Sequence, residues 1–114
     1  MTRSQLAPPT NSTLRKYGIT QEVWYTFLDL QDGKCPVCQR EFTNELRPVI
    51  DHEHAKGYKK MKAEDRARYV RGLVCNYDNR RRIPTNSKGI SATELAYNVY
   101  IYLSDYDIRR NDDN

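Results

Sequence analysis

The sequence has few cysteines, only two histidines and no long apolar runs. No apolar stretch approaches the roughly 20 residues that a membrane-spanning helix needs. The first 13 residues also lack the apolar segment of a signal peptide, so we expect a cytoplasmic protein. With 114 residues, of which 38% are hydrophobic, the chain has room for one compact domain with a thin core.

Three cysteines leave one without a partner in any disulfide framework, and a Cys-x-x-Cys pair with a distant cysteine indicates metal binding instead. Cys35 and Cys38 form the pair, and Cys75-x-x-Asp78 repeats its spacing. Zinc accepts carboxylate oxygen as well as thiolate, so a Cys3Asp structural site is chemically allowed. The alternatives are a fourth ligand from water or histidine, or three core cysteines that bind nothing.

The pattern predicts an α+β domain over residues 14–106, after a flexible arm over 1–13 that contains Pro8-Pro9. Thr20 is a good N-cap for a helix whose apolar stripe is Val23, Phe27 and Leu30, widened by Trp24 and Leu28. β-Branched residues predict strands at 47–54 and 70–75.

The segment between these strands, residues 58–69, is a basic insertion, which we expect to be an extended loop with a short helix. A helix should begin near residue 75 and stop before Pro84, which lacks a backbone donor. Ser91-x-x-Glu94 is a capping box for a last helix. Residues 107–114 should be a frayed acidic tail.

Positive charge is concentrated in the middle of the chain, although the net charge is only +4. Such a concentration suits a phosphate backbone, and the alternative is an ordinary solvated surface. The residues that we expect to contact nucleic acid are Lys59, Lys60, Lys62, Arg66, Arg68, Arg71, Arg80, Arg81 and Arg82.

Both histidines lie in the segment Asp51-His52-Glu53-His54. On a strand the two carboxylates point to one side and the two imidazoles to the other. A neutral imidazole can take the proton of an attacking water, and a hard cation held by carboxylate or amide oxygen can neutralise a phosphate. The alternative for this cluster alone is a surface turn or an extra metal-binding pair.

The order KYGIT, YTFL, DGKCPVC, IDHEH and VRGLVCNYDN resembles the recombination endonuclease VII family of phage HNH (ββα-metal) nucleases, over roughly residues 15–79. The resemblance implies a β-hairpin with an Asp-His pair, a following helix with an asparagine, and a structural zinc knuckle. Asp78 stands where the family has its fourth zinc cysteine, so the knuckle is either Cys3Asp or degraded.

Carried over by position, the resemblance assigns the catalytic Mg²⁺ (or Mn²⁺) to Asp51 and Asn79. His52 becomes the general base, and His54 steadies the phosphate or the leaving oxygen. Cys35, Cys38 and Cys75 become zinc ligands.

The resemblance therefore implies a Mg-dependent DNA endonuclease, acting in the host cytoplasm if phage-encoded, alone or as a homodimer or part of a larger phage assembly. Nicking, double-strand cutting and resolution of branched DNA all stay open. The alternative function is a zinc-knuckle nucleic-acid-binding module without catalysis.

Overall fold

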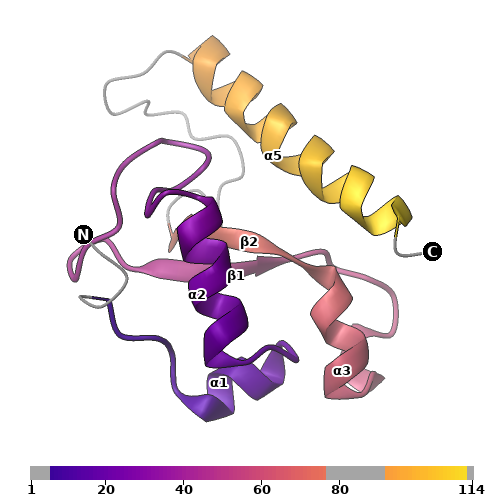
Figure 1. Cartoon of the computed structure of the whole chain (residues 1–114). Helices are drawn as coiled ribbons and strands as arrows, with labels where there is room; N and C mark the ends of the chain where they lie inside the picture. Colours follow the sequence, from indigo (N-terminus) through magenta and orange to yellow (C-terminus); the bar gives the residue numbers. More distant parts are fainter. Residues whose placement is uncertain (1–5, 77–91, 113–114) are drawn as a thin grey trace.

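Two strands and several helices make up the computed structural model, which describes residues 6–76 and 92–112. The α+β class that the sequence predicts is confirmed. In chain order the elements are α1 (Asn11–Lys16), α2 (Gln21–Leu30), β1 (Pro48–His52), η2 (Tyr58–Lys60), α3 (Ala63–Arg66), η3 (Ala67–Tyr69), β2 (Val70–Cys75) and α5 (Ala92–Asp112) (Figure 1).

Within the N-terminal segment that we expect to be a flexible arm, Leu6 packs against the domain, whereas residues 7 and 10–13 are exposed. The side chain of Leu6 is 1% exposed, and its carbonyl accepts a hydrogen bond from the Tyr25 hydroxyl at 3.1 Å. Thr10 caps α1 by accepting from the backbone N–H of Thr13.

Helix α2 begins at the predicted cap, since the Thr20 hydroxyl accepts from the Val23 backbone N–H at 3.2 Å. Its buried residues are Trp24 and Leu28, whereas Val23 is 39% and Leu30 77% exposed. The predicted apolar stripe is therefore confirmed at Trp24, Leu28 and the partly buried Phe27, and is wrong at Val23 and Leu30. The large indole of Trp24, fully buried, sets the face that turns to the core.

Strands β1 and β2 form an antiparallel hairpin in which Ile50 pairs with Leu73 and Asp51 pairs with Gly72. The register shifts between Asp51 and His52, which is the effect of a β-bulge. A side chain at Gly72 would meet Gln31 Oε1 at 2.9 Å and the Tyr102 ring at 3.0 Å. Glycine at this position therefore lets α5 approach the hairpin opposite Asp51.

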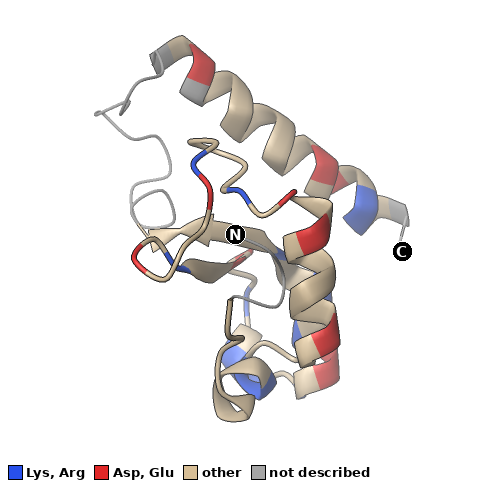
Figure 2. Cartoon of the chain, turned by 60° about the vertical axis from the view of Figure 1, so that its left-hand side comes forward, with Lys and Arg blue, Asp and Glu red and all other residues tan. Residues whose placement is uncertain are grey.

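Helix α5 lies on one side of the hairpin, and α1 and α3 lie on the other (Figures 1 and 2). The amide of Asn98 donates to the carbonyl of Val37 at 2.8 Å, and Arg109 donates to the carbonyls of Val70 and Arg71. Helix α5 runs to Asp112, and the fraying expected over residues 107–114 stays a prediction.

The basic insertion, residues 58–69, consists of η2, α3 and η3. It packs on the loop after α1, where a Cβ on Gly18 would lie 1.8 Å from the carbonyl oxygen of Ala63. Charges of both signs are spread over the surface, with acidic positions along α5 and basic ones near its C-terminal end (Figure 2). In the described part of the chain, none of the helices combines the length and apolar character of a membrane span.

Candidate active site and metal centre

Four polar side chains at the end of β1 and just after it, residues 51–54, are divided between two faces. The hydroxyls of Tyr102 and Tyr106, one turn apart on α5, donate to Asp51 and Glu53 at 2.8 and 3.0 Å. The rings of His52 and His54 stack on each other on the other face, with centroids 4.8 Å apart. The alternation expected of a strand is thus retained through the bulge.

Asp51 is the buried carboxylate of the described core, only 8% exposed. The guanidinium of Arg71 donates to both of its oxygens, from Nε at 2.9 Å and from Nη2 at 3.1 Å. Such a bidentate pair is stronger and more directional than a single bond. Burial, followed by the Asp51 charge, raises the pKa of Tyr102 far above its usual range, so this hydroxyl stays protonated as a donor.

The carboxylate of Asp51 has about four lone-pair sites, and its described donors use three of them. Oδ2 accepts from both Arg71 and Tyr102, whereas Oδ1 accepts from Arg71 alone. One acceptor site on Oδ1 therefore remains for a hard cation, which prefers oxygen ligands. Asn79, the second predicted ligand of that ion, lies outside the described residues.

His52 is enclosed by aromatic rings on the face away from Asp51. Tyr58 stacks on it with a centroid separation of 4.6 Å and an angle of 24°, and Tyr17 lies tilted at 5.3 Å. Burial, and then the neighbouring His54, lower the pKa of His52 below its usual 6.5. The imidazole is therefore neutral at neutral pH, as a general base must be.

His52 and His54 open into a cleft of about 1040 Å³. Among the residues that line it, Lys16, Lys56, Lys59, Lys60 and Arg66 are cationic. None of the described residues that line it is a carboxylate, so the cleft suits a polyanion such as a nucleic-acid backbone. Sequence reasoning did not place Tyr17, Lys16, Lys56 and Tyr58 here, because the cleft forms only when α1 and η2 meet.

The predicted phosphate contacts fall into distinct groups in the structure. Lys59 and Lys60 line the cleft, whereas Lys62 and Arg68 are exposed outside its lining. Arg66 and Arg71 donate hydrogen bonds inside the fold: Arg66 donates to backbone carbonyls, and Arg71 donates to Asp51. The remaining three, Arg80, Arg81 and Arg82, lie outside the described residues.

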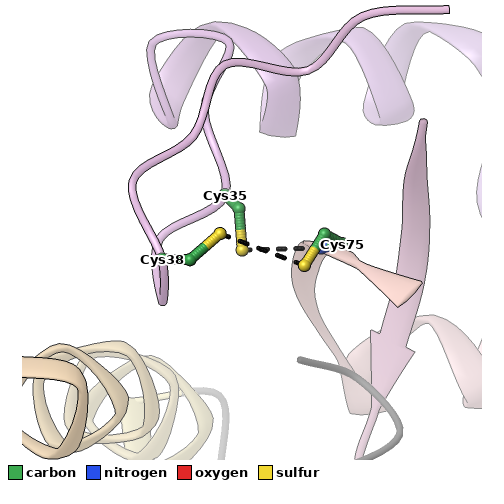
Figure 3. Close-up of side chains that lie close together, drawn as sticks. All are labelled: Cys35, Cys38 and Cys75. Atoms are coloured by element: carbon green, nitrogen blue, oxygen red, sulfur yellow. Dashed lines mark hydrogen bonds between the residues drawn. The ribbon is translucent and has the colours of Figure 1, made fainter. Parts of the chain in front are cut away.

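A second polar centre forms where Cys35 and Cys38 meet Cys75 at the end of β2 (Figure 3). All three thiols are buried, form no disulfide, and lie within 4.8 Å of one another. The sulfurs of Cys38 and Cys75 are 4.0 Å apart, close to the edge of about 3.8 Å that follows for tetrahedral zinc from Zn–S bonds of about 2.3 Å. The cluster therefore fits a zinc ion.

The turn that carries the cysteine pair is held by its own backbone. The N–H of Cys35 donates to the carbonyl of Arg40 at 2.9 Å, and Gln39 adopts a positive φ of 65°. Arg40 also donates to the sulfur of Cys38 at 3.4 Å. The neighbouring thiols of Cys35 and Cys75, aided by Arg40, lower the pKa of Cys38, which favours the thiolate that a metal requires.

Asp78, the predicted fourth zinc ligand, lies outside the described residues. Its assignment therefore stays a prediction, and the three cysteines are the part of the zinc site that the structure brings together.

Comparison with known proteins gives a family and two phage relatives. The family model described as recombination endonuclease VII matches residues 10–94. The gene 59 proteins of Mycobacterium phages D29 and L5 are 34% and 33% identical over 67 residues, or 59% of this chain. The match covers 34% of each relative, so the chain aligns with about a third of their length. No solved structure matches the chain significantly.

Proposed function

Because the chain belongs to the recombination endonuclease VII family, we propose that it is a metal-dependent DNA endonuclease of the HNH (ββα-metal) class. The observation that carries the proposal is the position of His52. Its imidazole lies at the end of β1, is kept neutral by burial, and opens into a cleft whose described lining has five cationic side chains and no carboxylate.

In this proposal each face of β1 has one task. Neutral His52 takes a proton from the water that attacks the phosphorus, and His54, on the same face, steadies the phosphate or the leaving oxygen. Lys59 and Lys60 bind flanking phosphates in the cleft. When bound by Asp51 and Asn79, Mg²⁺ or Mn²⁺ would neutralise charge at the scissile phosphate.

Arg71 and Tyr102 support this assignment of Asp51 by fixing the carboxylate in one orientation. Because they leave one acceptor site on Oδ1, Asp51 can offer a single oxygen to the cation. Cys35, Cys38 and Cys75 would hold a structural zinc, with Asp78 as the fourth ligand. That ion would fix the end of β2 and the start of the chain that leads to Asn79.

A second candidate function, nucleic-acid binding without catalysis, is favoured by one observation. The positive charge of Arg71 lies within 2.9 Å of Asp51 and opposes the approach of a cation to the same carboxylate. Metal-dependent turnover separates the two candidates, since binding alone requires neither His52 nor a divalent ion.

The decisive experiment incubates purified protein with supercoiled plasmid and Mg²⁺, with EDTA in a parallel reaction. We expect nicking or linearisation that EDTA abolishes and that His52→Ala reduces by about 100-fold or more. Tyr97→Ala is the matched control, because this ring is 62% exposed on α5 and should cut as the wild type does.

DNA binding without cleavage in every sample would favour the second candidate. Cleavage that survives His52→Ala at full rate would remove His52 from the role of base. The ratio of nicked to linear product also reports whether one or both strands are cut, and cleavage of a branched oligonucleotide tests junction resolution. Homodimer formation and action in the host cytoplasm stay predictions.

A further inference from the structure

The basic insertion brings an aromatic ring against the proposed general base. Tyr58, the first residue of η2, stacks on His52 at 4.6 Å and 24°, and His54 lies 4.8 Å from His52 at 26°. His52 therefore stacks with two rings, one from His54 just after its strand and one from Tyr58 of the insertion.

Tyr58 is fixed in this position by contacts that do not involve His52. Gly57, with a φ of +77°, turns the chain just before η2, a conformation that glycine adopts without strain. The guanidinium of Arg66 donates to the carbonyls of Lys16 at 3.0 Å and Lys59 at 2.9 Å. Its central carbon lies 5.5 Å from the Tyr58 ring centroid, within cation–π range.

These contacts link η2 to Lys16 at the end of α1 and place Tyr58 from outside the hairpin. Arg66 thereby acts as an internal clamp, through hydrogen bonds from Nη1 and Nη2 to protein carbonyls. The insertion is in part a wall of the site, since Tyr58, Lys59 and Lys60 all line the cleft.

The hydroxyl of Tyr58 is buried and has no hydrogen-bond partner among the described residues. The ring is consequently the part of Tyr58 that contacts His52. A general base must hold its nitrogen within hydrogen-bond reach of the water, and a shift of about 1 Å can cost about 100-fold in rate. An imidazole at a strand end needs packing to hold that orientation, because its own side-chain torsions permit several.

We propose that Tyr58 is a positioning residue for His52: its ring, held in place by Arg66, fixes the plane of the imidazole that faces the cleft. This inference rests on the proposed function. It assigns to the insertion a role in catalysis that neither DNA contact nor a solvated loop would give it.

The test compares Tyr58→Leu and Tyr58→Phe, with Tyr97→Leu as the exposed control. Leucine keeps the apolar contact but removes the aromatic face, whereas phenylalanine keeps that face and loses the hydroxyl. We expect Tyr58→Leu to lower kcat by about 10- to 100-fold at unchanged KM for DNA. Tyr58→Phe and Tyr97→Leu should cut as the wild type does.

NMR of the imidazole protons provides the readout that is independent of cleavage. The His52 ring protons, assigned with His52→Ala, should be shifted upfield by the Tyr58 ring in the wild type and in Tyr58→Phe. They should move towards unstacked values in Tyr58→Leu. Equal melting temperatures of the variants would show that the fold is intact.

Unchanged His52 resonances and kcat in Tyr58→Leu would overturn the inference. A loss in Tyr58→Phe as large as that in Tyr58→Leu would also overturn it, because the hydroxyl would then be the active group. If the wild type cuts no DNA, the proposed function fails together with the catalytic part of this inference. A stack seen by NMR alone would identify Tyr58 as a packing residue.

Discussion

The two faces at the end of β1 differ in nearly every physical respect although their residues alternate along only four positions, 51–54. On the α5 side, Asp51 and Glu53 are bonded by Tyr102 and Tyr106, and Asp51 is paired with Arg71. On the other side, the two histidines lie among aromatic rings at the wall of an open basic cleft. One face is thus bonded mainly by protein donors, which leave one acceptor site on Asp51 Oδ1, and the other is open to an anionic ligand.

The difference shows how a strand end can keep a carboxylate and a base adjacent in sequence yet in separate environments. A buried carboxylate needs donors, since leaving it unpaired is costly, and α5 supplies them. A general base needs access to substrate together with enough burial to stay neutral. Period-two alternation provides both environments from neighbouring residues.

The largest expected effect is unfolding of the domain, which would abolish both faces of β1 together. Cys75 ends β2, opposite Pro48 in the register, and its sulfur belongs to the cysteine cluster. Structural zinc binds small peptides with about 10–16 kcal/mol. We therefore expect Cys75→Ser to lose zinc and to unfold at 25 °C, measured by elemental analysis and circular dichroism.

The matched variant for this prediction is Asp78→Ala, which should weaken zinc binding without abolishing it. A folded, zinc-free Cys75→Ser protein would show that packing alone holds the hairpin. It would also contradict a structural role for a metal in the cysteine cluster.

An intermediate loss of folding stability is expected from a change on the carboxylate face alone. Tyr102→Phe removes the hydroxyl that donates to Asp51 Oδ2, and loss of a hydrogen bond to a charged acceptor costs about 1–3 kcal/mol. Urea unfolding should show that loss. Tyr106→Phe is the matched control and should cost less, because Glu53 is not among the buried residues.

The His52 resonances should be the same in wild type and Tyr102→Phe if the faces are independent. Movement of those resonances would show that the two faces are coupled through the bulge and are not independent.

The smallest expected effect is the pH dependence of stability and of kcat/KM that His52 produces. Burial lowers the pKa of His52 below 6.5, so the folded state disfavours the protonated imidazole. As pH falls through 6.5 the unfolded chain takes up the proton first, and the stability that His52 contributes is lost towards lower pH. The neutral base persists below pH 6.5, so kcat/KM should decline only on the acid side of that value.

A rate profile between pH 5 and pH 8, the usual titration range of histidine, checks this prediction, with NMR titration of His52 beside it. A flat profile, or an acid limb centred above 6.5, would contradict it.

Several features followed from the sequence because they depend on local chemistry. The Thr20 cap, the two strands and the cysteine pair are set by residues close together in the chain. Val23 and Leu30 were wrongly included in the buried stripe of α2, because periodicity alone does not weigh one tryptophan against smaller apolar residues. The order found in residues 6–13 depends on contacts with Tyr25 and with Arg47, which donates to the carbonyl of Ala7.

The sequence by itself determined the chemical inventory: the Asp-His pair at a strand end, the three cysteines and the excess of basic residues in the middle of the chain. Only the tertiary structure decided which partners these groups have. Arg71 pairs with Asp51, Arg66 donates to backbone carbonyls, and Tyr58 stacks on His52. The physical reason is that a long side chain can reach many donors and acceptors. The packing of segments that are distant in sequence determines which of these groups lie within bonding distance of it.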